Sequence, residues 1–194
     1  MNYGIITSFV VGGLFMLTVL AFNISLNSTT QEATLTTINQ EKFNTLADII
    51  SYDIDRMGFN ADESVVIQNP IQTSNSKEVE FYVSSTGIVR WYAVTSDEVT
   101  STSNPDDYYL YREDEFGDTS KFPVTNFNLK YFTEYTGEIS NPTTLSALTD
   151  VQVEVELIVE SAEAVQSATN STPYYHRAVW KRTFTPSNVN IKQW

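Results

Sequence analysis

The sequence contains no cysteine and a single histidine, His176. Without cysteine, disulfides, thiol catalysis and cysteine-ligated metals are excluded within the chain, so stability has to come from packing. With one histidine and no cysteine, a zinc site or a Ser-His-Asp triad would have almost no residues to draw on. We therefore interpret His176 as a structural residue. The sequence also contains no glycine-rich phosphate-binding loop.

Basic residues are few: 11 Lys and Arg stand against 24 Asp and Glu, which gives a formal net charge of −13. An acidic domain repels nucleic acid at long range, so we expect no nucleic-acid partner. Glu154 and Glu156 lie on one face of a predicted strand, and a solvated face explains them better than paired-carboxylate hydrolysis. We expect no catalytic residue, no cofactor and no enzymatic activity.

Charge is also missing from the N-terminal part of the chain, where no charged residue occurs between Met1 and Gln31. The stretch from Gly4 to Ile24 is long enough to cross the roughly 30 Å core of a bilayer as a helix of about 20 residues. A cleaved signal peptide and a buried soluble helix are the alternatives. The signal would need a basic n-region, whereas Lys42 is the first basic residue. The pattern therefore predicts a membrane helix.

Proline is absent from Met1 to Asn69, so nothing interrupts a helix there. Beyond the apolar stretch, apolar residues recur at spacings of three to five, which is typical of one helical stripe: Leu35, Ile38, Phe43, Leu46, Ile50, Ile54 and Met57. The charged residues, Asp53 among them, are expected largely outside this stripe. Gly58 provides a helix stop. We predict one helix from about Tyr3 to Met57, some 80 Å long at 1.5 Å per residue.

From Glu63 onwards the hydrophobic period changes to two, which predicts strands. The candidates are Ser64 to Gln68, Glu78 to Ser84, Ile88 to Val94, Tyr108 to Arg112, Asn126 to Tyr135, Asp150 to Glu160 and Tyr174 to Phe184. The second and third should form a hairpin with Gly87 in a left-handed position. Turn-rich segments separate the strands: Asn69 to Lys77, Ser96 to Asp107, Glu115 to Phe122, Gly137 to Ala147 and Ala162 to Pro173.

These elements predict an α+β fold in which one antiparallel sheet packs on the amphipathic half of the helix. We divide the chain into a transmembrane or assembly helix over residues 1–27, its amphipathic continuation over 28–58, and a β-rich globular head over 59–194.

Two further clusters have alternative interpretations. Asp114, Glu115 and Asp118 are candidate ligands for calcium, although EF-hand spacing is lacking and a solvated loop is the simpler reading. Seven tyrosines could form a carbohydrate-binding or adhesive surface, although strand propensity also explains them: Tyr108, Tyr109, Tyr111, Tyr131, Tyr135, Tyr174 and Tyr175.

The order of the motifs resembles the type IV pilin-like superfamily, and most closely its minor pilins of the PilW type and minor pseudopilins. The segment from Leu46 to Phe59 resembles the end of that family's first helix. Four later stretches follow in the family's order: Tyr108 to Arg112, Val124 to Tyr131, Val151 to Val159, and Arg182 to Phe184. Two features of pilin precursors are not matched, because Asn2-Tyr3 is no basic leader and Phe9 stands where the family has a Glu.

The resemblance implies a structural subunit that is anchored by its helix and assembles with copies of itself or other pilin-like subunits into a surface filament. It also implies a head outside the inner or cytoplasmic membrane, and Gly4 as the candidate processing position. Our alternative is a single-pass membrane-anchored β-domain that binds a surface ligand or carbohydrate. The residues predicted to face lipid or neighbouring helices are Ile5, Ile6, Phe9, Val10, Gly12, Gly13, Leu14, Phe15, Leu17, Val19, Leu20 and Phe22.

Overall fold

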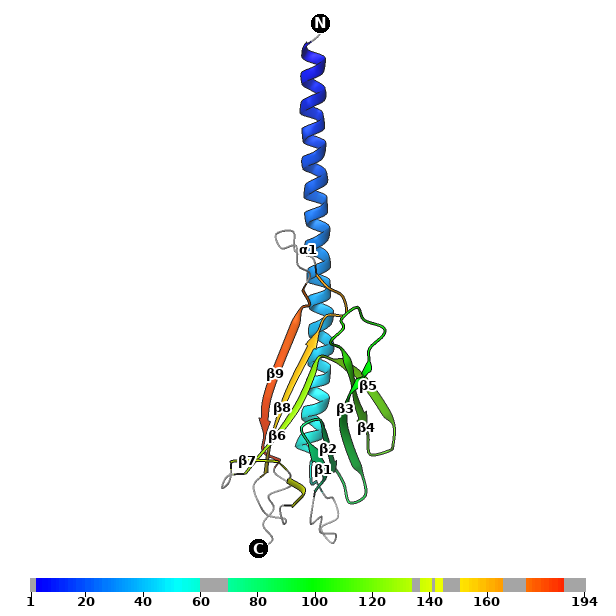
Figure 1. Cartoon of the computed structure of the whole chain (residues 1–194), viewed down its shortest axis with the longest axis vertical. Coiled ribbons are helices and arrows are strands. Elements are labelled where there is room, and N and C mark those ends of the chain that lie inside the picture. The colour runs from blue at the N-terminus through cyan, green and yellow to red at the C-terminus, as the bar shows by residue number, and fades with distance from the viewer. Residues whose placement is uncertain are drawn as a thin grey trace.

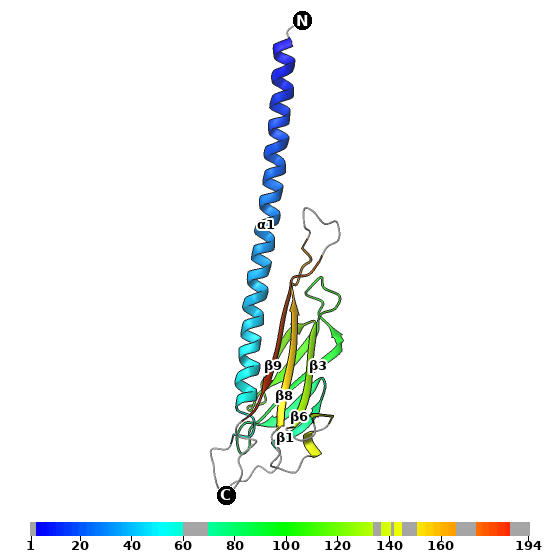
Figure 2. The same cartoon turned by 90° about the vertical axis from the view of Figure 1, so that its left-hand side faces the viewer.

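One long helix lies behind two antiparallel sheets in the computed structural model, which describes residues 3–59, 70–133, 137–140, 142–144, 151–165 and 174–186 (Figures 1 and 2). The first half of the helix projects beyond the sheets and the second half packs against them. The α+β architecture is therefore confirmed. The elements are α1 (Tyr3–Asp55), β1 (Ile71–Asn75), β2 (Glu78–Tyr82), β3 (Ile88–Glu98), β4 (Tyr108–Glu113), β5 (Thr119–Val124), β6 (Asn126–Thr133), β7 (Gly137–Ile139), a 3-10 turn at Pro142–Thr144, β8 (Val151–Glu160) and β9 (Arg177–Phe184).

Helix α1 is continuous over 53 residues and ends at Asp55, two residues before the predicted Met57. A tightened turn follows Asp55, and Gly58 adopts a φ of 75°, the left-handed conformation that glycine tolerates best. The N–H of Gly58 donates to the carbonyl of Tyr82 over 2.7 Å, so the end of the helix is tied to β2.

The expectation of a single sheet is wrong. The strands form a five-stranded sheet in the order β1-β2-β3-β4-β5 and a four-stranded sheet in the order β7-β6-β8-β9. The two sheets meet where the N–H of Phe127 in β6 donates to the hydroxyl of Tyr108 in β4 over 2.8 Å. The helix therefore backs two adjoining sheets.

Strands β1, β5 and β7 were missed because they lie in segments predicted as turn-rich. All three are at sheet edges, so they pair on one side and lack the alternating pattern of a half-buried strand. Pro123 in β5 is tolerated for the same reason, since an edge strand can lose one donor. The predicted strand from Ser64 to Gln68 lies outside the described residues.

The core lies between α1 and the inner faces of both sheets. From the helix it takes Phe43, Leu46, Ile50, Ile54 and Met57, as the stripe predicted. The stripe begins later than expected: Leu35 is half-buried and Ile38 is 44% exposed, because the sheets reach no farther up the helix. In β8 the alternating residues Val151, Val153, Val155, Leu157 and Val159 are all buried, which confirms the strongest predicted strand.

The predicted hairpin of β2 and β3 is present, but the reason for its glycine is different. Gly87 does not have a positive φ, unlike Gly58, Gly117 and Gly137. A Cβ at Gly87 would instead lie 2.5 Å from the hydroxyl of Ser84 and 3.0 Å from Cβ of Glu115. Close approach of the β4–β5 turn, and not backbone conformation, requires the glycine here.

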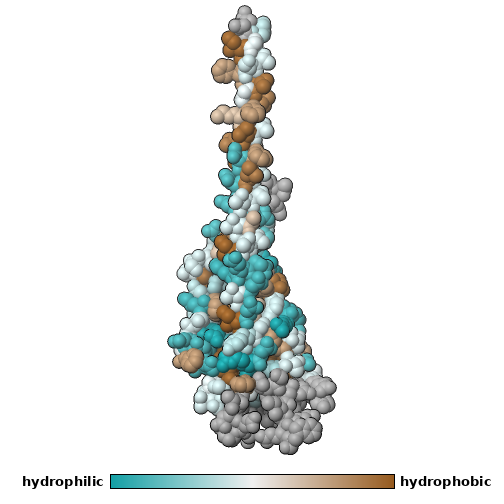
Figure 3. All heavy atoms as spheres, turned by 180° about the vertical axis from the view of Figure 1, so that it is seen from behind, coloured by the Kyte–Doolittle hydropathy of each residue, from teal (hydrophilic) through white to brown (hydrophobic). Residues whose placement is uncertain are grey.

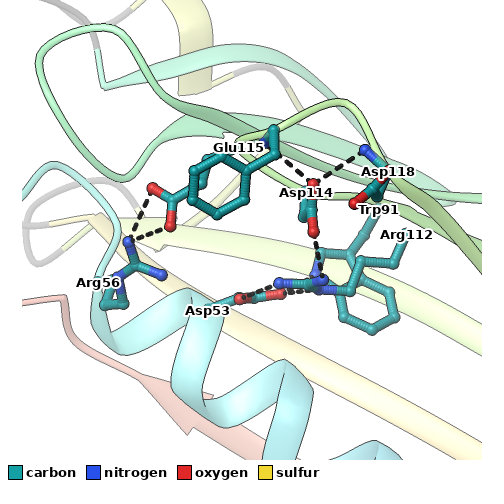
Figure 4. A network of polar contacts seen from close by, with 8 residues as sticks. Asp53, Arg56, Trp91, Arg112, Asp114, Glu115 and Asp118 are labelled. Atoms are coloured by element: carbon teal, nitrogen blue, oxygen red, sulfur yellow. Dashed lines mark hydrogen bonds and ion pairs between the residues drawn. The ribbon is translucent and has the colours of Figure 1, made fainter.

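Asp53 lies on the buried face of α1, so its expected place outside the apolar stripe is wrong. Its side chain is fully buried and accepts from Arg112 Nε over 2.7 Å, from Arg112 Nη2 over 3.0 Å, and from Trp91 Nε1 over 3.0 Å (Figure 4). Two donors from β3 and β4 thus replace the water that a buried carboxylate loses.

The ion pair is extended on both sides (Figure 4). Asp114 lies 3.8 Å from Arg112, and Glu115 accepts two hydrogen bonds from Arg56 at the end of α1 over 2.9 and 3.0 Å. The network joins the last turns of the helix to β3, β4 and the β4–β5 turn.

Asp53→Asn should lower the free energy of unfolding by about 3 kcal/mol, because it leaves the largely buried guanidinium of Arg112 without its full counter-charge. Asp48→Asn is the matched control on the same helix, since Asp48 is exposed and should change stability by less than about 0.5 kcal/mol. Urea unfolding of the full chain in detergent measures both. Equal midpoints for the two variants would contradict the role given to Asp53.

A second acid, Asp107, is buried between β3 and β4 and receives the hydroxyl of Thr125 over 3.2 Å. Burial raises the pKa of Asp107 above its ordinary 3.8, while the Thr102 and Thr125 hydroxyls oppose the shift. A raised pKa means that the folded state holds the proton more tightly than the unfolded state. The associated stability is full below pH 3.8 and is lost as the pH rises through the folded pKa.

Asp107→Asn should therefore stabilise the chain at pH 7 and make little difference near pH 3.5, because asparagine never pays for a buried charge. Urea midpoints of the full chain at the two pH values test this, with the exposed Asp118→Asn as control. A destabilisation of the same size at both pH values would show that hydrogen bonding, and not ionisation, dominates at this position.

Candidate functional site: the exposed half of the helix

The part of α1 that projects beyond the sheets, residues 3–27, is called the arm below. All twelve residues predicted to face lipid or neighbouring helices lie on it, and all are exposed. The exposed fractions of its ten large apolar residues in that set run from 43% for Val19 to 79% for Phe9. Figure 3, which looks from the helix side, shows apolar residues along the upper helix. The arm is thus an apolar surface that no described part of the chain covers.

Polar side chains on the arm are satisfied within the helix itself. The hydroxyls of Thr7, Ser8 and Thr18 donate to the carbonyls four residues earlier over 2.7 to 2.9 Å, and the amide of Asn23 donates to the carbonyl of Val19 over 2.9 Å. A hydroxyl bonded in this way adds no unpaired donor to an apolar surrounding. The arm therefore presents no unsatisfied hydroxyl proton to lipid at these three positions.

Small residues leave gaps in the apolar surface. A Cβ at Gly4, Gly12 or Gly13 would meet no atom within 4 Å, so these glycines are not required by the packing of the chain on itself. Two adjacent glycines in an apolar helix let another helix approach closely. Gly4, the candidate processing position, lies in the exposed first turn of α1.

The arm meets the head where the segment before β9 touches the helix. The amide of Asn39, a buried residue, donates to the carbonyl of His176 over 3.2 Å. Seven residues earlier, Glu32 accepts from the hydroxyl of Tyr174 over 2.9 Å and lies 3.7 Å from His176 Nε2. Glu32 and Asn39 were not singled out from the sequence, although their heptad spacing places both on one helix face.

A groove of about 820 Å³ opens beside this junction, between α1 and the segment that follows β8. Its lining is mixed, with Ile24 and Leu35 on the helix, Val165 opposite, and the carboxylates of Glu32 and Glu163. The groove overlaps the last turns of the arm, since Ala21 and Ile24 line it. Nothing in this lining forms a catalytic arrangement among the described residues.

The calcium candidates are engaged in other contacts. Asp114 Oδ1 accepts the N–H groups of Phe116 and Asp118 at 3.0 Å each, as in an Asx-type turn, and Glu115 binds Arg56. Within the described ranges, no group of three or more His, Cys, Asp or Glu side chains is placed to hold a metal ion. The structure therefore does not bring Asp114, Glu115 and Asp118 together as a metal site.

Two of the predicted surface tyrosines, Tyr109 and Tyr111 of β4, form a ladder with Tyr92 of β3. Tyr92 stacks on Tyr111 with ring centroids 5.1 Å apart, and Tyr111 lies 6.2 Å from Tyr109. Arg90 covers Tyr92 at 4.4 Å and Lys121 covers Tyr109 at 4.1 Å. The rings therefore contact one another and cations across the strands, which stabilises the outer face of the sheet. Tyr131, in contrast, is a core residue.

Comparison of the chain with protein-family models, with curated proteins and with solved structures found no match. The resemblance to pilin-like proteins stays a prediction. By its length and composition, α1 could cross a membrane, and its most apolar part is not buried against the described head. The arm is therefore a candidate membrane anchor.

Leu14→Lys places a charge at the centre of the arm and should weaken binding to neutral liposomes by about 100-fold, since a central lysine costs about 3 kcal/mol in a bilayer. Thr37→Lys is the control, because it adds the same charge at an exposed helix position beyond the arm. Flotation of the full chain with liposomes measures both. Equal flotation of the two variants would mean that the arm does not enter the bilayer.

Proposed function

We propose that this chain is a structural, pilin-like or pseudopilin-like subunit, anchored in a membrane by its arm and assembling through the arm into a surface filament. The observation that carries the proposal is the exposure of the entire apolar arm on a helix whose other half is fixed to a folded head. The resemblance in motif order supports it.

The arm needs a non-aqueous surrounding. Burying one large apolar side chain is worth about 1.5–3 kcal/mol, so exposing ten of them to water costs more than the roughly 5–15 kcal/mol by which an ordinary domain is stable. Lipid and other apolar helices both remove that cost. A subunit of this kind can therefore pass from a bilayer to a helix bundle without exposing the arm.

The shape of the molecule supports assembly through parallel arms. A single helix is about 10–12 Å wide with its side chains, whereas the head adds two sheets on one side of α1 (Figures 1 and 2). Arms can converge on a common axis while heads lie around them. The continuous helix, without proline, holds each arm at a fixed angle to its head.

Gly12→Leu combined with Gly13→Leu separates assembly from anchoring. Both positions are open, so the fold should be unchanged, but two leucines would hold neighbouring arms apart. We expect about tenfold less assembled full-length protein in detergent, equivalent to ~1.4 kcal/mol of lost arm packing, with unchanged liposome flotation. Sedimentation measures the assembled fraction.

Val10→Leu combined with Val11→Leu is the control, since it adds bulk to the same arm without filling the glycine gap. A full chain that sediments as a monomer under all conditions and never appears in surface filaments would refute the filament proposal. It would then leave the anchored ligand-binding module as the remaining reading.

A further inference from the structure

The few basic residues of this acidic chain are unevenly distributed. Strand β9 holds Arg177, Lys181 and Arg182, three of the chain's 11 Lys and Arg, within six positions. Copies with a net charge of −13 repel one another, so a contact between copies benefits from setting cations against acids. The location of this basic strand therefore bears on how heads pack.

Strand β9 is the edge of the four-stranded sheet and pairs only with β8 in the described chain. Arg177 and Lys181 bind Glu160 and Glu154 of β8 over 2.6 and 2.9 Å, yet their side chains stay 59% and 53% exposed. Arg182 lies over the ring of Phe184 at 4.7 Å and is on the opposite face of the strand from Arg177 and Lys181, because adjacent residues of a strand alternate. The face that holds the exposed Arg177 and Lys181 can therefore accept carboxylates from outside.

A complementary row lies on the opposite side of the molecule. Glu41 and Asp48 are seven residues apart on α1, so they lie on one line of the helix, facing away from the buried stripe. Both are exposed, and neither has an ion-pair partner within the described ranges. Figure 3 shows the molecule from the helix side, where hydrophilic residues are mixed with intermediate and hydrophobic ones below the arm.

The two rows lie at the same height along the molecule. The hydrogen bond from Asn39 to the carbonyl of His176 sets the start of β9 level with the helical turn of Glu41. From there α1 and β9 run in the same direction (Figure 1). Glu41 to Asp48 spans about 10 Å of helix, and Arg177 to Lys181 spans about 13 Å of strand. Long side chains accommodate the difference.

We propose that β9 of one copy docks on the Glu41–Asp48 row of a second copy standing beside it, with Arg177 facing Glu41 and Lys181 facing Asp48. Parallel arms bring neighbouring heads to this orientation, so the inference rests on the proposed function. Because the two surfaces are different, the contact is heterologous. It repeats from copy to copy and generates a ring or a helical filament.

Charge reversal on the acidic row tests the proposal against simple repulsion. Glu41→Lys with Asp48→Lys makes the net charge of −13 less negative by four, so a mean repulsion between copies would fall and assembly would improve. Docking predicts the opposite result, namely a smaller assembled fraction. Two attractive pairs become repulsive, and the assembled fraction of full-length protein at low salt should fall about tenfold.

The matched control is Glu98→Lys with Asp118→Lys, which changes the net charge equally at two exposed acids away from the row. It should assemble at least as well as the wild type. Arg177→Glu with Lys181→Glu should also lose assembly, and combining these with Glu41→Lys and Asp48→Lys should restore it, because both pairs re-form with reversed sign. Sedimentation at low and high salt measures all five proteins.

If the wild type assembles and the acidic-row variant assembles to the same extent as the control, the docking proposal is refuted and the filament proposal stands. Failure of the four-fold swap to restore assembly also overturns the docking and leaves the cations as protection of an edge strand against pairing. If the wild type never assembles, both the filament proposal and the docking are refuted.

Discussion

The buried carboxylate of Asp53 is the contact on which the arrangement of helix and sheets depends. A charge removed from water has to be matched by donors at fixed positions, and here Arg112 and Trp91 supply them from neighbouring strands. Rotation of α1 by one residue would turn Asp53 about 100° away from both. The ion pair thus fixes which face of the helix packs on the head and, with it, which face points outward.

The rotational position of α1 determines the two surfaces on which the proposed function depends. It leaves Glu41 and Asp48 opposite the core, and it continues, through an unbroken helix, into an arm whose apolar residues cover every side. Close to the boundary, Asn39 and Glu32 hold the segment that leads into β9. The height of the basic strand relative to the acidic row therefore follows from contacts made at the junction of arm and head.

Much of the fold could be predicted from the sequence, because the patterns that indicate each element involve residues that are neighbours in the chain. The apolar run, the missing prolines and Gly58 predicted α1 nearly to the residue, and alternation predicted β8. The short edge strands β1, β5 and β7 carry no such signal, so they were taken for turns, and one sheet was expected instead of two. Gly87 was identified as important for the wrong reason, since the atoms that crowd it belong partly to Glu115, far along the chain.

The sequence by itself determined the long helix, its apolar arm and the acidic balance, because these follow from residues that are neighbours in the chain. Only the tertiary structure decided that Asp53 is a core residue, that Asp114 and Glu115 serve Arg112 and Arg56 and do not form a metal site, and that β9 stands level with Glu41. The physical reason is the same in each case. The partners that decide most of these roles lie tens of residues away, as Arg112 does from Asp53 and Arg56 from Glu115. A charge shows its role only when its partner is in place.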